Sequence, residues 1–230
     1  MKTVLLTGSS SGIGRACALR FLEEGYYVIG VSRTASGICH DNFEEHLFDL
    51  KDTHMAIDFA RSIKAGHSID ILVNNAGLGY YGPFSDISPD KINEMVTVNF
   101  TIPMILSNLF LPSLKKTKGV IINISSVTAK NNNNTHGVVY GATKAGLTSF
   151  SSSLFAEIRK TGIRVVTIHP EMTDTKLYRN ADFCADSGEG CSLNTNDVCN
   201  AIFYALKADA CNISDITLTP QLNRIARKKS

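Results

Sequence analysis

Short runs of consecutive apolar residues, rich in valine and isoleucine, alternate along the chain with longer segments of mixed polarity. These runs predict strands at Thr3–Leu6, Tyr27–Val31, Ile69–Val73, Val120–Ile124, Arg164–Ile168 and Ile216–Leu218. A strand that is apolar on both faces is typical of a parallel sheet covered by helices on both sides. The pattern therefore predicts a buried parallel sheet through the centre of the protein.

The segments between these runs carry apolar residues at helical spacing. They predict helices at Gly12–Glu24, Thr53–Lys64, Pro89–Lys115, Val139–Lys160 and Thr195–Ala208. Within the third, Pro103 and Pro112 are expected to interrupt or end the helix. Alternating strands and helices predict crossover units, so the expected fold class is α/β, a Rossmann-like doubly wound parallel sheet with helices on both faces.

The length and charge of the chain narrow the range of functions. At 230 residues, the chain is expected to form a single domain, 1–230. A formal net charge of +2 is too small to indicate a nucleic-acid or membrane surface. The basic tail Arg224–Lys229 is expected to be a solvated end, and the asparagine run 131–134 an exposed loop.

The six cysteines include no C-x-x-C pair and no His/Cys cluster with zinc-ligand spacing, so no metal site is predicted. The first residues are too briefly apolar for a signal peptide, and no later stretch is expected to span a bilayer. These features predict a reduced, cytoplasmic compartment.

A glycine-rich motif, T-G-S-S-S-G-I-G, spans Thr7–Gly14 between the first predicted strand and the first predicted helix. Glycines there would let the backbone approach a pyrophosphate, while the helix N-terminus favours its negative charge. The spacing differs from G-x-G-x-x-G, and the alternative is a Gly/Ser turn that only caps the helix. Its position after a strand favours a dinucleotide site.

The residues that follow the second predicted strand bear on the type of dinucleotide. An acid at this place would bond the ribose 2′-hydroxyl, whereas an arginine accommodates a 2′-phosphate. The sequence here is V-S-R, with Arg33 beside the uncharged Ser32. NADP(H) is therefore preferred over NAD(H), unless Arg33 is only a solvated surface residue.

The later half of the chain carries a candidate acid/base pair. Tyr140 and Lys144 are four residues apart, so both lie on one face of a helix, where an ammonium group can stabilise a phenolate. A lowered tyrosine pKa would bring this group closer to physiological pH. Ser125 and Ser126 follow the strand V-I-I-N-I. Without this context, Tyr140 and Lys144 would be an ordinary surface pair.

Taken in order, these motifs resemble the short-chain dehydrogenase/reductase family. The resemblance covers nearly the whole chain and rests on T-G-S-S-S-G-I-G, N-N-A-G at Asn74–Gly77, V-N-F with Asn99, N-I-S-S ending at Ser126, Y-G-A-T-K and H-P-E-M-T-D-T. It implies that Tyr140 is the proton donor and acceptor. It also implies that Lys144 lowers the Tyr140 pKa, that Ser126 polarises the substrate oxygen, and that Asn99 anchors a water in a proton relay. Ser126 is preferred over Ser125, although the two could exchange roles.

The resemblance also implies a set of cofactor-binding residues. These are Gly8, Ser10, Ser11, Gly12, Ile13 and Gly14 in the phosphate loop, Asp49 and Leu50 at the adenine, Asn75, Ala76 and Gly77 at the adenosine ribose, Tyr140 and Lys144 at the nicotinamide ribose, and Pro170 and Thr173 at the nicotinamide amide. Two alternatives stay open: Asp49 as a plain loop acid, and N-N-A-G as a motif that only stabilises the central sheet.

The sequence departs from the family pattern at three places. Glu171 adds bulk and charge where the family commonly has glycine, and the spacing from Ser126 to Tyr140 is one residue longer than in many members. The segment 171–194 is rich in Gly, Ser, Asp and Thr, which predicts a mobile substrate lid or mere surface disorder.

The function predicted from these residues is NADP(H)-dependent hydride transfer between the nicotinamide and a carbonyl or secondary alcohol. The alternatives are a 3-oxoacyl carrier-protein reductase and, in a different class, an inactive dinucleotide-sensing or scaffold protein. A small-molecule substrate is expected, with no nucleic acid or membrane partner. The long helices Asn93–Leu111 and Val139–Lys160, which pack into interfaces in this family, predict a homodimer or homotetramer.

Overall fold

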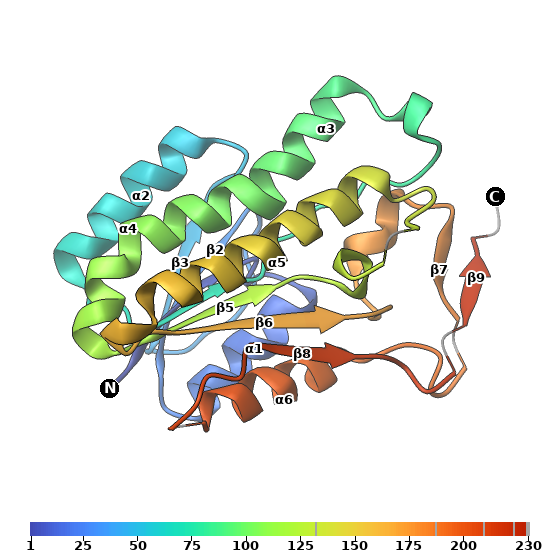
Figure 1. Cartoon of the computed structure of the whole chain (residues 1–230). Coiled ribbons are helices and arrows are strands. Elements are labelled where there is room, and N and C mark those ends of the chain that lie inside the picture. Colours follow the sequence, from blue (N-terminus) through green and yellow to red (C-terminus); the bar gives the residue numbers. More distant parts are fainter. Residues whose placement is uncertain (132, 187, 209, 223, 229–230) are drawn as a thin grey trace.

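A seven-stranded parallel sheet forms the centre of the protein (Figure 1). The computed structural model describes residues 1–131, 133–186, 188–208, 210–222 and 224–228. The strands are β1 (Thr3–Thr7), β2 (Tyr27–Ser32), β3 (Phe43–Leu47), β4 (Ile71–Asn74), β5 (Val120–Ile124), β6 (Arg164–Pro170) and β8 (Asp215–Leu218). Their spatial order is β3-β2-β1-β4-β5-β6-β8, which reverses direction between β1 and β4. The predicted doubly wound α/β fold is confirmed.

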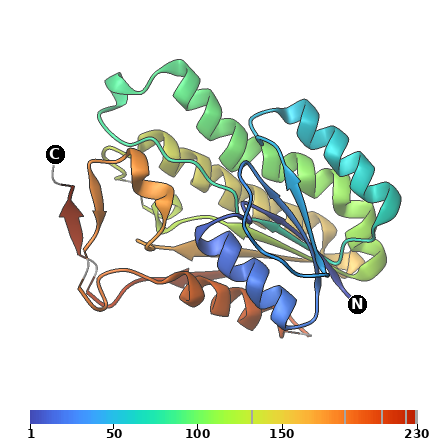
Figure 2. The same cartoon turned by 180° about the vertical axis from the view of Figure 1, so that it is seen from behind.

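Helices cover both faces of this sheet. They are α1 (Gly12–Glu23), α2 (Thr53–Gly66), α3 (Pro89–Val96), α4 (Ile102–Thr117), α5 (Val138–Ile158) and α6 (Thr195–Leu206), with short helical turns η1 (Phe84–Asp86), η3 (Val127–Ala129), η4 (Arg159–Thr161) and η5 (Lys176–Asn180). Figures 1 and 2 show α1 and α6 on one face and α2, α4 and α5 on the other. Side chains of β1 alternate between two cores, Leu5 facing α2 and α4 while Val4 and Leu6 face α1 and α6.

The interior strands match the predicted ranges closely, but the edge strand β3 was not predicted. Its sequence, F-E-E-H-L, is mostly polar, and its residues are half-buried or exposed. An edge strand pairs on one side only and is incompletely covered, so it lacks the continuous apolar run by which the interior strands were found.

The third predicted helix contains a widened turn rather than a break at proline. A π-helical turn, η2 (Thr97–Thr101), joins α3 to α4. Pro103 lies in the first turn of α4, where its missing N–H costs little, and Pro112 is accommodated inside α4. The prolines were expected to interrupt or end the helix: neither ends it, Pro112 does not interrupt it, and the π turn interrupts the regular α-helix just before Pro103.

The run Pro89–Thr117 is long and apolar enough, by length and composition alone, to cross a membrane, which the sequence reading did not anticipate. In this structure its inward side chains fill the core. Leu106, Phe110 and Leu114 are buried against β-sheet and α2 residues. The apolar character of the run is thus explained by its position as a core helix.

The basic tail is paired rather than free. Strand β9 (Ile225–Arg227) pairs antiparallel with β7 (Phe183–Ala185), a strand inside the segment predicted as a lid. Beyond β9, the Lys228 backbone N–H donates to the carbonyl of Asp182 at 2.9 Å. Arg224, Ile225 and Lys228 are exposed, as expected of a solvated end, but the tail is held by strand pairing; Gln221, Leu222 and Arg224–Lys228 are described, and Lys229 lies outside the described residues. The pairing joins segments far apart in sequence, so no local pattern announced it.

Candidate functional site

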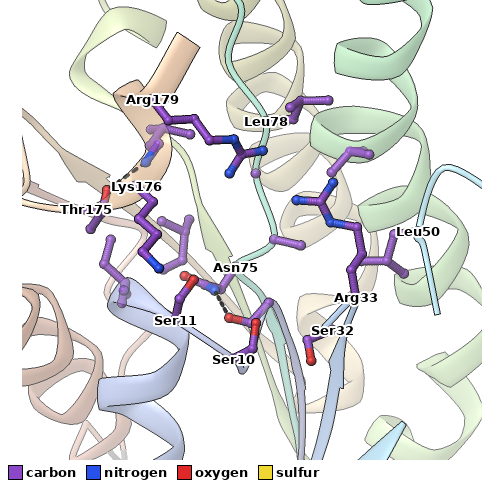
Figure 3. A pocket seen from close by; sticks show the side chains of 18 of the residues that line it. Ser10, Ser11, Ser32, Arg33, Leu50, Asn75, Leu78, Thr175, Lys176 and Arg179 are labelled. Atoms are coloured by element: carbon purple, nitrogen blue, oxygen red, sulfur yellow. Dashed lines mark hydrogen bonds between the residues drawn. The ribbon is translucent and has the colours of Figure 1, made fainter. Parts of the chain in front are cut away.

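The site lies at the carboxyl ends of the parallel strands, where the order of the sheet reverses between β1 and β4. A cavity of about 480 Å³ opens there, lined by the loops after β1, β2, β4, β5 and β6 (Figure 3). In open parallel sheets this crevice is the usual place for a ligand. The fold therefore collects motifs that are distant in the sequence.

The glycine loop forms one wall of the cavity. Gly8 and Gly12 have φ angles of +75° and +54°, a left-handed conformation that side chains with a Cβ rarely adopt. A Cβ on Gly14 would lie 2.0 Å from the Gly8 carbonyl oxygen, so Gly14 allows the helix to pack closely on the loop. Ser11, which precedes α1, makes no side-chain capping bond. The first-turn N–H groups of α1 thus suit the negatively charged phosphates of a dinucleotide.

The N-N-A-G segment both braces the sheet and borders the cavity. The Asn74 side chain donates to Asn123 at 2.8 Å, inside the sheet. The Asn75 side chain donates to the Thr7 carbonyl at 2.9 Å, which ties the end of β4 to the glycine loop. Asn75, Ala76 and Gly77 also line the cavity. A structural role for the motif is therefore compatible with cofactor contact.

The far end of the cavity is basic. Arg33 follows β2, is exposed, and lines the cavity together with Asp49 and Leu50. The Asp49 carboxylate accepts from the backbone N–H of Lys51 at 3.0 Å, so it also shapes its own loop. An arginine here is the group that favours a 2′-phosphate.

The two serines after β5 have different surroundings, although both line the cavity. The Ser125 hydroxyl lies 3.1 Å from the Lys144 carbonyl and 2.9 Å from the Thr148 hydroxyl, both on α5. The Ser126 hydroxyl accepts from the Thr128 backbone N–H at 3.2 Å and hydrogen-bonds the Tyr140 phenol. Ser126 is therefore the serine in contact with the candidate acid.

A buried histidine contacts the backbone carbonyl of Ser126. His169 on β6 is fully buried, and its Nδ1 lies 3.2 Å from the Ser126 carbonyl oxygen. Burial lowers the pKa of His169, so the neutral imidazole, in one tautomer, donates a hydrogen bond to this carbonyl. The sequence analysis did not single out His169, because a histidine within an apolar strand carries no local signal.

Tyr140 and Lys144 lie on α5, as predicted, and both are almost completely buried. Burial raises the pKa of Tyr140, the nearby Tyr178 adds to the rise, and the Ser126 hydrogen bond opposes it. This direction is opposite to the predicted one, because desolvation of the phenolate dominates and the Lys144 Nζ lies 5.7 Å from the centre of the Tyr140 ring.

Lys144 lines the cavity but is almost completely buried. Its Nζ donates to the Ile124 carbonyl at 2.8 Å, and no acidic side chain pairs with it among the described residues. Burial lowers the pKa of Lys144 to about 8. The protein therefore holds a desolvated cation close to the candidate acid, at an energetic cost that proton release relieves.

The energetic cost of burying the Lys144 ammonium predicts that the free energy of unfolding depends on pH. The unfolded chain holds the Lys144 proton up to a pKa of 10.5, whereas the folded protein releases it near pH 8. Because the unfolded state binds more protons in this window, stability rises with pH. Between pH 7 and pH 10, we expect wild type to gain about 2.5 kcal/mol relative to Lys144→Met. Urea unfolding at a series of pH values measures the difference.

Lys64→Met removes an exposed lysine at the end of α2 and controls for the general loss of one charge. A wild-type minus Lys144→Met difference that stays constant from pH 7 to pH 10 would contradict the lowered Lys144 pKa.

Asn99 lies at the π turn and is fully buried. Its side-chain oxygen accepts from the Leu78 N–H at 2.8 Å, and its amide donates to the Leu78 carbonyl at 2.8 Å and to Thr143 at 3.1 Å. The turn thus ties α5 to the loop after β4. Asn99 does not itself line the cavity.

Most of the residues predicted from the sequence border one cavity. These are Gly8, Ser10, Ser11, Gly12, Ile13, Arg33, Asp49, Leu50, Asn75, Ala76, Gly77, Ser126, Tyr140, Lys144, Pro170 and Thr173. Gly14 and Asn99 lie behind its wall. The sequence analysis missed Lys176, Tyr178 and Arg179 as individual lining residues, because their segment has no regular pattern.

Three aromatic rings form a cluster next to Tyr140, which Tyr81 contacts directly. The ring centre of Tyr81 lies 5.6 Å from those of Tyr140 and Tyr178, and Phe183 lies 5.3 Å from Tyr81. We call Tyr81, Tyr178 and Phe183 the aromatic wall. Two of its members come from the segment 171–194, and one of these, Tyr178, lines the cavity together with Tyr140.

Comparison with known proteins yields one family. A sequence model described as short chain dehydrogenase matches residues 2–182. A serine 3-dehydrogenase of Agrobacterium fabrum is 34% identical over 95% of this chain and 93% of its own, and a 3-oxoacyl-[acyl-carrier-protein] reductase of Buchnera aphidicola is 32% identical over 78% and 76%. The closed form of serine dehydrogenase complexed with NADP+ superposes with a TM-score of 0.83 at 25% identity, covering 95% of this chain and 94% of the other.

Proposed function

The chain belongs to the short-chain dehydrogenase family, and from this premise we propose an NADP(H)-dependent oxidoreductase in which Tyr140 is the general acid/base. Enzymes of this family are oxidoreductases acting on CH–OH groups. The observation that carries the proposal is the meeting of Ser126, Tyr140 and Lys144 in the cavity that the glycine loop borders. The reaction is hydride transfer between the nicotinamide and a carbonyl or secondary alcohol.

Tyr140, Ser126 and Lys144 have different roles at the reacting oxygen of the substrate. The bound nicotinamide supplies or accepts the hydride. Tyr140, protonated because burial raises its pKa, donates its proton to the carbonyl oxygen in reduction and takes it back in oxidation. Ser126 bonds the same oxygen, and the Lys144 charge stabilises the phenolate that forms. The Asn99 side chain donates a hydrogen bond to the Leu78 carbonyl, and this contact holds the π turn against the loop after β4.

NADP(H) is favoured by the basic end of the cavity. Arg33 lies directly after β2, and the neighbouring Ser32 hydroxyl donates to the Thr34 carbonyl at 2.7 Å, so no carboxylate occupies the position that would bond a free ribose 2′-hydroxyl. A fixed positive charge at this end suits a 2′-phosphate.

The aromatic wall supports a short substrate. Tyr140 is only 4% exposed, its ring packs against Tyr81, and Tyr178 lines the same cavity, so bulky aromatic side chains surround the candidate acid. The likeness to serine 3-dehydrogenase agrees with this limit. We therefore place small 3-hydroxy acids, serine among them, first in the substrate class.

A second candidate is a 3-oxoacyl carrier-protein reductase, which the similarity to the Buchnera reductase favours. A panel separates the candidates: NADP+ with L-serine and other short 3-hydroxy acids, and NADPH with simple ketones, aldehydes and 3-oxoacyl thioesters. Turnover of short hydroxy acids supports the proposal. Turnover of 3-oxoacyl thioesters alone supports the second candidate, and binding of NADPH without any turnover supports an inactive cofactor-sensing protein.

Association into a homodimer or homotetramer belongs to the same proposal. The long helices α4 and α5 lie together on one side of the sheet (Figure 1), and Val96 on α3 is 37% exposed. Exposed apolar residues beside long helices are compatible with a symmetric interface. Light scattering of the purified protein measures the assembly directly.

A further inference from the structure

Two cations of the segment 171–194 reach into the cavity mouth. Lys176 and Arg179 belong to η5, and both line the cavity although they are exposed. Figure 3 shows their side chains directed into the space between the glycine loop and Arg33. Within the described part of the chain, neither forms an ion pair with an acidic side chain.

Lys176 lies over the glycine loop. The preceding residue, Thr175, lies close to this loop: a Cβ added to Gly12 would lie 3.2 Å from the Thr175 methyl group. In Figure 3 the Lys176 ammonium end points toward Ser10 and Ser11. The flexible Lys176 side chain thus places a positive charge near the N–H groups of the glycine loop that suit a pyrophosphate.

Arg179 faces Arg33 across the cavity. The two guanidinium groups point toward one another in Figure 3, from η5 and from the end of β2. The nearby acid Glu94 is already engaged, since it accepts from Lys51 at 2.9 Å and from the Tyr80 phenol at 2.7 Å. Two like charges that converge on one space are the arrangement expected for a bound anion.

The tail of the chain holds η5 in this position. The Lys228 Nζ donates to the Tyr178 carbonyl at 2.5 Å and to the Arg179 carbonyl at 3.2 Å. A cation at these carbonyls stabilises the end of the short helix. The backbone that carries Arg179 is therefore fixed by β7, β9 and Lys228 together.

We propose that the segment 171–194 itself recognises the phosphates of the cofactor: Arg179 binds the 2′-phosphate opposite Arg33, and Lys176 binds the pyrophosphate above the glycine loop. This inference rests on the proposed function, because it needs a phosphorylated dinucleotide in the cavity. Arg179 then acts as a determinant of NADP(H) specificity.

The test is calorimetric binding of NADPH and NADH to the full chain and to single variants. Arg179→Gln should weaken NADPH binding by about tenfold, which corresponds to about 1.4 kcal/mol, and NADH binding by less than about twofold. Lys176→Gln should weaken both cofactors by a similar factor, about threefold to tenfold, because both contain the pyrophosphate. Lys64→Gln removes one exposed charge outside the cavity and should change neither affinity.

Each result decides between the inference and the function on which it rests. A wild type that prefers NADPH, together with Arg179→Gln that keeps this preference, overturns the Arg179 assignment alone. Unchanged affinities in Lys176→Gln overturn the Lys176 assignment, whichever cofactor is used. A wild type that binds NADH as tightly as NADPH overturns both the proposed NADP(H) preference and the role of Arg179.

Discussion

Replacing Tyr140 with phenylalanine is expected to lower kcat by a factor of about 10² to 10⁴, the usual contribution of a positioned general acid. The ring is buried and would still pack against Tyr81, so the fold should survive loss of the hydroxyl. What is lost is the proton donor and its hydrogen bond with Ser126. The Kd for NADPH should stay within about threefold, since the glycine loop and Arg33 are untouched. Steady-state kinetics and calorimetry measure the two quantities.

Tyr204→Phe is the matched control. Tyr204 lies on α6, is 66% exposed and does not line the cavity, so the same loss of a phenol hydroxyl should leave kcat unchanged. If Tyr140→Phe keeps more than about a tenth of wild-type turnover, Tyr140 is not the general acid. If Tyr140→Phe also loses NADPH binding, the loss of turnover reflects damage to the site instead.

Replacing Arg33 with aspartate is expected to shift the ratio of kcat/KM for NADPH over NADH by about 100-fold toward NADH. A hydrogen bond to a charged group contributes about 1.5–3 kcal/mol, and the introduced carboxylate both repels a 2′-phosphate and can accept from a free ribose 2′-hydroxyl. Ser32 beside it carries no charge that would oppose the change. The ratio of the two specificity constants, measured with one substrate, gives the result.

The control for Arg33→Asp is Arg61→Asp, the same charge reversal on the outer surface of α2. Its side chain is 69% exposed and pairs with Asp58, so the change should affect stability slightly and cofactor choice not at all. An unchanged ratio in Arg33→Asp would show that Arg33 is solvated surface, the alternative that the sequence left open. Equal shifts in both variants would show a nonspecific effect of net charge.

The proposed substrate class and the proposed cofactor preference both depend on the segment 171–194. Tyr178 and Phe183 of the segment 171–194 complete the aromatic wall, while Lys176 and Arg179 of the same segment face the phosphate end of the cavity. Movement of this segment would therefore act on both ends of the site at once. Under the two proposals, the segment 171–194 contributes to the choice of both substrate and cofactor.

The local pattern predicted the parts of the site that lie on interior strands and their following loops. The strand β5 is apolar throughout, so its end, and with it Ser126, could be located from the sequence. The helix α5 extends through Tyr140 and Lys144, so a spacing of four residues was enough to place both on one face. The glycines of Thr7–Gly14 carried a further local requirement, the left-handed backbone at Gly8 and Gly12.

Other features depended on partners that lie far away in the sequence. The π turn at Asn99, the polar edge strand β3 and the pairing of β9 with β7 have no periodicity of their own. Their form is set by what packs against them, and a window of neighbouring residues does not contain that information.

The sequence by itself therefore determined the α/β fold class, the glycine loop and the placement of Tyr140 and Lys144 on one helix face, because each follows from the backbone needs of consecutive residues. Only the tertiary structure decided the protonation of that pair and the makeup of the cavity mouth. Burial, not the neighbouring charge, sets the direction of the Tyr140 and Lys144 pKa values. Likewise, Arg179 meets Arg33 only because the fold brings η5 across from the end of β2. Desolvation and charge proximity depend on distances through space, which the order of residues does not contain.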